Sequence, residues 1–339
     1  MDDRKQRIMM AIVSLYSAEG EPVGSNLLSR HFDMAVSSAT LRNEMAALTR
    51  LGLLEQPHTS AGRVPTTKGY RYYVDNLLGD PTALPKTDRE ALDELFQKLD
   101  YDPEKMAQGA AKVLSDLLGY AVLTTTPRAK DISVAHFEVV QVGRHTAAVL
   151  AVTAAGGVLT RVAKVDFELE DSDTAAVASA LNKHLRFVAE PDINTTLVRT
   201  LVDSLGAGGS RYWPLLSAAL TLMSQAGTPN LYFEGMQYLL HWPELETNLR
   251  TLLELTANPE RVEGMLHPRG DQTSIMFGDE FPEHQIPGLC IISRHYLAGG
   301  GQSGIIAVMG PARMRYREVI PKLEYFSTLL GKGMSGVGA

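Results

Sequence analysis

Residues 36–51 carry the clearest periodic spacing of apolar positions in the chain. Three apolar side chains recur there at the spacing of one helix face: Leu41, Met45 and Leu48. Ser37 and Ser38 precede them, and a serine hydroxyl can accept a hydrogen bond from a free N–H group of the first turn. No Glu or Gln stands three residues further on to complete a capping box, so the helix can begin at either serine.

The opposite face of this predicted helix is small and hydrogen-bonding rather than acidic. Its members are Ala39, Arg42, Asn43, Ala46 and Arg50. Arginine and asparagine can each make paired hydrogen bonds to a base edge, and alanine lets a helix approach a duplex closely. The pattern predicts a recognition helix for DNA. A solvated surface helix and a winged helix that binds protein are the alternatives.

The chain before this helix supplies its context. An apolar stripe formed by Ile8, Ala11, Ile12, Leu15 and Tyr16 predicts a helix that ends before Gly20. Ser25 is expected to cap a short second helix over residues 26–31, and residues 33–35 form a turn. Two short helices joined in this way are typical of the helix-turn-helix motif.

The chain after the recognition helix predicts a wing. Residues 53–56 and 63–66 have strand character on either side of a turn-rich loop, residues 57–62. Basic, hydroxyl and tyrosine side chains follow on a predicted helix, and these residue types hold phosphates. The predicted DNA contacts are Ser37, Ser38, Ala39, Arg42 and Asn43 in the recognition helix, Thr59, Ser60 and Arg63 in the wing, and Lys68 and Arg71 beyond it. Arg42 and Asn43 are the candidates for base readout.

Residues 79–85 form a polar, proline-bearing connector, and the chain beyond it mixes helices with strands. Helices are predicted from residues 87 and 103, from near Ser172-Asp173 to Phe187, and over 193–205, 214–225, 231–240, 245–255 and 316–330. Strands are predicted over 121–125, 134–142, 146–153, 158–165, 274–278, 288–296 and 303–309. The valine-rich runs between residues 134 and 165, separated by tight turns, predict an antiparallel meander.

Length and composition indicate an ordinary globular protein. The 339 residues suffice for two or three domains, and 45% of them are hydrophobic. No apolar run reaches the roughly 18 residues of a membrane span, and the charged N-terminus lacks a signal-peptide core. The single cysteine, Cys290, excludes an intrachain disulfide, fits a reducing cytoplasm, and is expected to be a buried core residue.

The charge distribution changes the interpretation of the net charge of −7. Residues 1–78 hold 9 basic and 8 acidic side chains, a net charge of +1, whereas the remaining 23 basic and 31 acidic side chains give −8. Residues 36–73 alone carry a net charge of +3. A locally basic patch on an acidic protein is compatible with DNA binding, because association depends on the field within a Debye length of about 8–10 Å.

Signals for catalysis, metal or a cofactor are weak. The glycine-rich residues 297–304 lack the Gly-Lys-Ser/Thr ending of a phosphate loop and lie between two predicted strands, which favours a hairpin. The acidic residues from Asp166 to Asp173 suit the start of a helix, and no histidine accompanies them. The histidines show no metal-ligand spacing. We therefore expect no enzyme, no metal and no cofactor.

Two segments, GLLEQPHTSAGRVPTTKGYRYYVDNLL and, just before it, VGSNLLSRHFDMAVSSATLRNEMAALTRL, resemble the HrcA family of heat-inducible transcription repressors. The similarity is dense over residues 4–78 and returns in GIIAVMGPARMRYREVIPKLEYFSTLL near the C-terminus. The resemblance implies a multidomain α+β protein. A winged helix-turn-helix domain (residues 1–79) would precede a GAF-like domain (85–130 and 229–332) that is interrupted by an inserted dimerisation domain (131–228), the meander with its helices.

The resemblance also implies a function. It implies a cytoplasmic, nucleoid-associated homodimer that represses chaperone and chaperonin operons from an inverted-repeat operator until heat stress, with the chaperonin modulating its activity. Two alternatives stay open: a repressor controlled by a small ligand in a GAF-like pocket, and a protein-interaction module without DNA binding.

Overall fold

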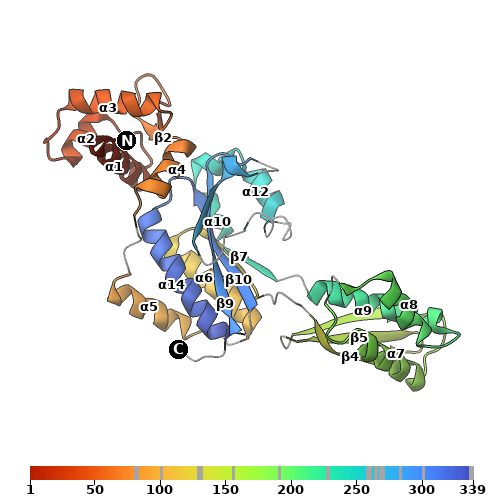
Figure 1. The fold of residues 1–339 in the computed structure, drawn as a ribbon. Coiled ribbons are helices and arrows are strands. Elements are labelled where there is room, and N and C mark those ends of the chain that lie inside the picture. The colour runs from red at the N-terminus through yellow and green to blue at the C-terminus, as the bar shows by residue number, and fades with distance from the viewer. Residues whose placement is uncertain are drawn as a thin grey trace. The chain divides into compact units, whose positions relative to one another are not determined.

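The computed structural model describes residues 1–79, 84–99, 102–127, 133–154, 157–189, 192–226, 230–256, 262, 266, 272–281, 285–299 and 302–335. The chain forms two compact units (Figure 1). The first comprises Met1–Thr126, Leu231–Gly299 and Gly304–Ala339, and the second comprises Pro127–Asn230 with Gly300–Ser303. We call residues 1–79 the head, the other described residues of the first unit the central domain, and the second unit the sheet unit.

The head is a winged helix. Its elements are α1 (Asp3–Glu19), α2 (Ser25–His31), α3 (Ser38–Arg50), β1 (Leu54–Glu55), β2 (Val64–Pro65) and α4 (Thr67–Asn76). The predicted order of helices and strands is confirmed, and α1 stops at Gly20 in the left-handed conformation. One detail was wrong: α2 begins at Ser25, after Gly24, so Ser25 does not cap it.

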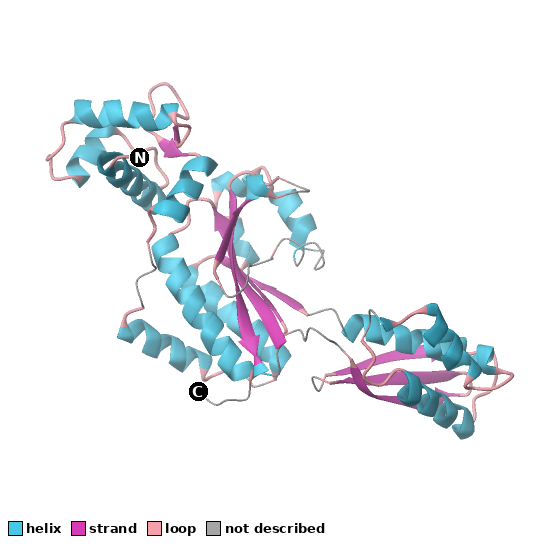
Figure 2. Cartoon of the chain, viewed as in Figure 1, coloured by secondary structure: helices cyan, strands magenta, loops and turns pink. Residues whose placement is uncertain are grey.

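The central domain is built on a five-stranded sheet in the order β7-β3-β10-β9-β8, covered by helices (Figure 2). The strands are β3 (Ala121–Thr125), β7 (Leu231–Glu234), β8 (Ser274–Phe277), β9 (Leu289–Ala298) and β10 (Gln302–Pro311). The helices are α5 (Lys86–Phe96), α6 (Pro103–Leu118), α10 (Met236–Leu239), α11 (Pro243–Glu246), α12 (Leu249–Thr256), the short η3 (Gly278–Glu280) and α14 (Tyr316–Met334).

Side chains alternate between the two faces of this sheet, as expected for strands covered on both sides. Val122 of β3 packs in a core with α6 and α14, whereas its neighbours Ala121 and Leu123 pack in a second core with α10 and α12. The first of these cores is continuous with the core of the head.

The helix predicted over residues 231–240 was wrong. Its first part is β7, whose Phe233 pairs with Leu123 in antiparallel register. Gly235 then takes a φ of 76°, and only four residues of helix follow in α10. Aromatic residues suit a pleated strand, and pairing with β3 decided between two locally similar apolar patterns.

The sheet unit holds the predicted meander, β4 (Val134–Gly143), β5 (Thr146–Thr153) and β6 (Val158–Lys164), in the order β4-β5-β6. The helices α7 (Asp171–His184), α8 (Thr195–Asp203) and α9 (Trp213–Ala226), with η2 (Gly209–Tyr212), follow in the chain. They contribute Leu181, Leu201 and Leu215 to a core with the inward strand residues Phe137 and Val149.

Helix α7 begins slightly earlier than predicted, because Glu170 and Asp173 form a capping box. The Asp173 carboxylate accepts a hydrogen bond from the Glu170 N–H at 2.9 Å, which confirms the helix-start reading of the acidic run. Among the described residues, no three His, Cys, Asp or Glu side chains are placed to hold a metal ion. Nor does any helix in the described ranges have the length and apolar character of a membrane span.

Candidate nucleic-acid interface

Helix α3 is fixed at its N-terminus by a hydroxyl cap. The Ser37 side chain accepts a hydrogen bond from the Thr40 N–H at 3.1 Å, which settles the start that the sequence left open. The turn before it is tight, because Asp33 and Met34 take φ values of 50° and 59°. Leu41 and Leu48 are fully buried, so the stripe predicted from the sequence packs α3 into the core of the head.

The outward face of α3 presents Ala39, Arg42 and Asn43 to solvent. The side chains of Arg42 and Asn43 make no hydrogen bond or ion pair with any other described residue, so both can engage a ligand without breaking a contact. The one acidic residue of α3, Glu44, is instead paired with Lys5 of α1 at 3.2 Å. Its charge is thereby neutralised, and the exposed face keeps the basic character that a duplex requires.

Ser38 has a structural part in addition to its place at the helix start. Its hydroxyl donates to the Asn26 side-chain oxygen at 2.9 Å and lies 3.2 Å from the Ser25 hydroxyl. These contacts tie the start of α3 to α2. They also place Asn26, an exposed amide, beside the predicted contacts. Sequence reasoning missed Asn26, since its position next to Ser38 depends on how the two helices pack.

The wing loop is held closed by a side chain at its start. Gln56 donates from its amide to the carbonyls of Thr59 at 2.8 Å and Ala61 at 3.0 Å, which holds the loop closed. The loop leaves Thr59 and Ser60 exposed. Arg63 forms a β-bridge with Val23, so the base of the wing is fastened to the segment between α1 and α2.

The position of Gly62 in the wing leaves no room for a side chain. A Cβ atom at this position would lie 2.4 Å from the Val23 carbonyl carbon, closer than any side chain permits. Only glycine lets the wing approach the segment between α1 and α2 so closely.

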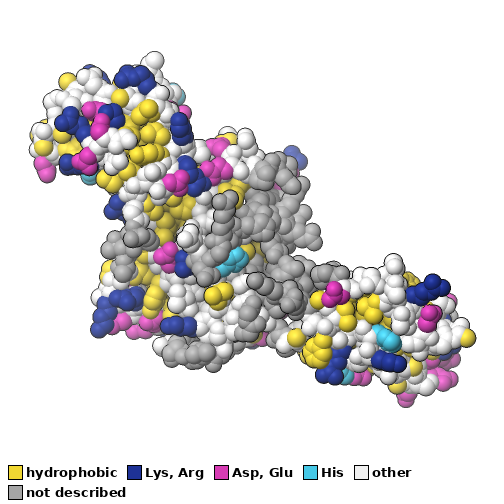
Figure 3. Space-filling view, in the orientation of Figure 1, with side chains coloured by type: hydrophobic (Ala, Val, Ile, Leu, Met, Phe, Trp, Pro, Cys, Tyr) yellow, Lys and Arg dark blue, Asp and Glu magenta, His cyan; other side chains and the backbone are white. Residues whose placement is uncertain are grey.

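The two basic residues of α4 occupy different surroundings. Lys68 is exposed, and its ammonium group donates to the Leu51 carbonyl at the end of α3 at 3.0 Å. Arg71 is half-buried, and its guanidinium is bound by Glu280 and by the Ile275 carbonyl of the central domain. The structure therefore keeps Lys68 with the exposed predicted contacts and separates Arg71 from them. Figure 3 shows lysine and arginine side chains at several places on the head surface.

The one cysteine of the chain lies in the core of the central domain. Cys290 is completely buried, as predicted, and burial raises the pKa of its thiol to about 12. A thiol with this pKa is protonated at neutral pH, which removes the only cysteine as a nucleophile.

Comparisons with known proteins agree with this geometry. Residues 1–76 match the family model described as winged helix-turn-helix transcription repressor, HrcA DNA-binding, and residues 104–320 match the HrcA protein C-terminal domain. The heat-inducible transcription repressor HrcA of Desulforudis audaxviator (strain MP104C) is 32% identical, over 98% of this chain and 97% of the relative. The protein of the same name from Brevibacillus brevis (strain 47) is 31% identical, over 99% and 97% of the two chains.

A solved structure of another protein shares the fold. The crystal structure of a hypothetical protein aligns over 100% of both chains with a TM-score of 0.63 and 23% sequence identity. Together, the exposed face of α3, the wing and the family matches identify the head as the DNA-binding domain of a transcriptional repressor, not an enzyme. The chain belongs to the HrcA family of heat-inducible transcription repressors.

Proposed function

We propose that this repressor binds an inverted-repeat operator as a homodimer and controls chaperone and chaperonin operons. The observation that carries the proposal is the exposed face of α3, where Arg42 and Asn43 have no partner among the described residues. A capped helix with a free arginine and asparagine near its N-terminus has the geometry for base readout in a major groove. The proposed place of action is the nucleoid in the cytoplasm.

In this proposal the head makes two kinds of contact. The first turns of α3 enter the major groove with Ser37, Ser38, Ala39, Arg42 and Asn43. The wing and α4 hold the phosphate backbone or the adjacent minor groove with Thr59, Ser60, Arg63 and Lys68. Phosphate contacts set the register of the head, and the base contacts supply sequence preference.

Two heads are needed because one carries little charge. A net charge of +3 over residues 36–73 supports only weak binding by a single head. When two heads are joined, the second contact becomes intramolecular and the overall affinity rises. An inverted repeat is the operator that matches two heads related by a twofold axis.

The outer face of the three-stranded sheet supports self-association. Val140 pairs with Ala148, and Ala148 pairs with Val162, so these side chains lie in one row across the sheet. Val140, Val142, Val158 and Val162 are 45%, 59%, 61% and 62% exposed, although the inner face of the same sheet is packed against helices. We infer that a second copy of the chain covers this face, since burial of apolar area contributes about 25 cal/mol per Å².

We further infer that the central domain is GAF-like and that residues 131–228 are a dimerisation domain inserted into it, between residues 85–130 and 229–332. The division of the chain into compact units supports these limits, because the chain leaves the first unit after Thr126 and returns to it at Leu231. The apolar outer face of the meander, in the same segment, supports the dimerisation role.

Selection from a pool of random duplexes with the purified full-length protein tests the operator. We expect an inverted repeat to emerge, and the same protein should protect a matching site upstream of a chaperonin operon in a footprint. Sedimentation at the binding concentration should show a dimer. A monomer that binds, or equal competition by a scrambled duplex, would contradict the proposal.

We propose that heat relieves repression by lowering the population of the operator-competent dimer, and that the chaperonin restores it. Proteins are marginally stable, and association stabilises the folded state by mass action, so a modest loss of stability on heating can lower the population of a dimer. The measurement is operator affinity over a temperature ramp, with and without purified chaperonin. Constant affinity up to the stress temperature, or no effect of chaperonin, would refute this mechanism.

A further inference from the structure

Arg71 joins the head to the central domain through a two-pronged ion pair. Its Nε donates to Glu280 Oε1 at 2.9 Å, and its Nη2 donates both to Glu280 Oε2 and to the Ile275 carbonyl, the latter at 2.8 Å. The guanidinium also lies over the Phe277 ring, 4.9 Å from the ring centre. A bidentate arginine–carboxylate pair specifies an angle as well as a distance, which a single contact does not.

The carboxylate is itself held in place. Glu280 accepts a hydrogen bond from the Phe277 N–H at 2.9 Å, so its orientation follows the backbone of β8 and η3. Burial raises the pKa of the Glu280 carboxyl, but the hydrogen bonds from Arg71 and Phe277 lower it more, and the pKa lies below its usual 4.5. The pair is therefore charged at neutral pH.

Further contacts surround the pair on the same side of the head. Thr67 of α4 donates to the Asp279 carboxylate. Tyr70 stacks on Phe277 with ring centres 6.1 Å apart, and Tyr73 lies at the same distance from Tyr316. Together with the Arg71–Glu280 pair, these contacts define what we call the α4 junction.

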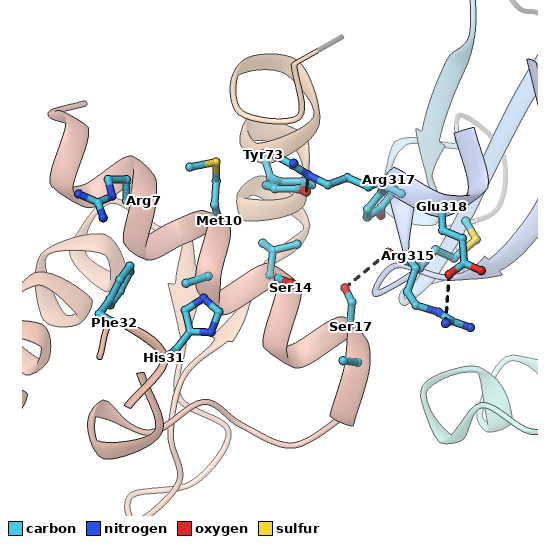
Figure 4. A pocket seen from close by; sticks show the side chains of 15 residues that line it. Arg7, Met10, Ser14, Ser17, His31, Phe32, Tyr73, Arg315, Arg317 and Glu318 are labelled. Atoms are coloured by element: carbon cyan, nitrogen blue, oxygen red, sulfur yellow. Dashed lines mark hydrogen bonds and ion pairs between the residues drawn. The ribbon is translucent and has the colours of Figure 1, made fainter. Parts of the chain in front are cut away.

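A second set of contacts lies on the side of α1, around a pocket of about 520 Å³ (Figure 4). Ser17 donates to the Met314 carbonyl at 3.5 Å, and Arg317 donates to the Tyr73 hydroxyl at 3.4 Å. These bonds are long, and they do not replace the directional pair at the α4 junction.

Helix α4 is in turn fastened to the end of the recognition helix. Thr66 donates to the Gly52 carbonyl at 2.7 Å, and Lys68 donates to the Leu51 carbonyl at 3.0 Å. Gly69 lies so close to Leu53 that an added Cβ would stand 2.1 Å from the Leu53 oxygen. Rotation of α4 therefore carries α3 with it.

We propose that Arg71 and Glu280 are positioning residues, which fix the recognition helix relative to the central domain so that the dimer selects operators by the spacing of their half-sites. The inference rests on the proposed function, a dimer on an inverted repeat. One added base pair moves a half-site by about 3.4 Å and rotates it by about 34°. A head held at a fixed angle to its own central domain cannot absorb that rotation by turning on the domain, whereas a loosely held head can.

The experiment measures the affinity of full-length variants for duplexes that differ only in spacing. The probes carry the half-sites obtained by selection from random DNA, at the selected separation and with one or two base pairs added or removed, and one duplex carries a single half-site. Glu280→Ala removes the ion pair by changing the central domain and leaves the sequence of the head intact. Arg71→Lys keeps the charge of the head but lacks the planar fork. Glu254→Gln, on an exposed side chain of α12 that pairs with Arg250, removes the same charge as a control.

We expect the wild-type protein and Glu254→Gln to lose at least about tenfold in affinity for one added base pair. Glu280→Ala and Arg71→Lys should lose less than about threefold, with affinity for the single half-site unchanged within about twofold. Spacing profiles identical to wild type overturn the inference, as does equal weakening on every duplex, which indicates a purely structural pair. If selection returns no inverted repeat, the result contradicts the proposed function. An inverted repeat with unchanged spacing profiles in the variants contradicts only the positioning role of Arg71 and Glu280. Thermal unfolding of each variant identifies any that do not fold, and Arg71→Lys then decides the outcome.

Discussion

The outward face of α3 and the outer face of the meander are both exposed, but they are built from opposite residue types. The first carries Ala39, Arg42 and Asn43, and Glu44, the one acidic residue of α3, is paired with Lys5. The second carries four exposed valines (Val140, Val142, Val158 and Val162), and the exposed pair His136–Glu138 lies on the same face. Binding by the first depends on charge and hydrogen bonds, so it weakens with salt and depends on base sequence. In the proposed dimer, association through the second depends on apolar burial, which varies little with ionic strength and not at all with base sequence.

The largest expected effect comes from placing a charge on the sheet face. Val162→Asp should raise the dissociation constant of the dimer by more than about 100-fold, because a carboxylate would be buried without a partner. Operator affinity should fall with it, while affinity for a single half-site stays constant. Sedimentation velocity and titration of the two duplexes measure the effects.

Thr196→Asp is the matched control, since it adds the same charge to an exposed position of α8 in the helical layer of the sheet unit. Its dimer constant should equal that of wild type. Equal loss in both variants would show that net charge, rather than the sheet face, controls association.

The next effect concerns base readout. Arg42→Ala should weaken operator binding by roughly 1–3 kcal/mol and relax the preference at one base pair of each half-site. The dimer constant should not change, because Arg42 belongs to the other surface. Titration against operators substituted singly at each position gives the measurement, and uniform weakening on all of them would remove Arg42 from base readout.

A smaller and different loss is expected at the phosphate backbone. Lys68→Ala should weaken binding to specific and random duplexes alike and reduce the slope of log affinity against log salt by about 1 for each head. Titrations at several salt concentrations provide the slope. An unchanged slope would mean that Lys68 only supports the end of α3 through the Leu51 carbonyl.

The smallest expected effect concerns the stability of the sheet unit rather than its exposed valine face. Asp173 accepts hydrogen bonds from Arg211, Tyr212 and the Glu170 N–H. Burial raises the pKa of its carboxyl, but the hydrogen bond from Tyr212, with those of Glu170 and Arg211, outweighs burial and lowers the pKa below 3.8. Because the pKa of Asp173 is lower in the folded than in the unfolded chain, its ionised carboxylate stabilises the fold at any pH above the pKa of the unfolded chain, about 3.8. This stabilisation is lost as the pH falls below about 3.8 and through the lower pKa of the folded chain.

Asp173→Asn should therefore lower the unfolding temperature of this unit at pH 7 by a few degrees and remove part of its acid sensitivity. Calorimetry of wild type and variant at pH 7 and pH 3 measures both changes. The unfolding transition of the first unit, which contains the head, should be unaffected. An equal response of wild type and variant to acid would exclude Asp173 as a source of the pH dependence.

Much of the head could be predicted from the sequence, since its patterns are local. The spacing of Leu41, Met45 and Leu48 determines which face of α3 is buried, and thereby which face carries Arg42 and Asn43. The same holds for the valine runs of the meander, whose predicted ranges differ from β4, β5 and β6 by at most one residue at an end. Helical and strand periodicities are set by backbone geometry, so they need no tertiary information.

The tertiary structure decided the contacts between distant segments. Arg71 belongs to the same basic run as Lys68 and lies 3.6 Å from Asp75 of its own helix, but Glu280, the carboxylate that binds it through two hydrogen bonds, lies 209 residues further along the chain. Leu231–Glu234 is a strand only because it pairs with β3, and Asn26 adjoins the recognition helix only because α2 packs on α3. A local pattern specifies which side of an element is apolar. Which distant residue pairs with a charged side chain, or which strand pairs with the edge of a sheet, depends on how the whole chain packs. The spacing of residues along the sequence does not encode these distant partners.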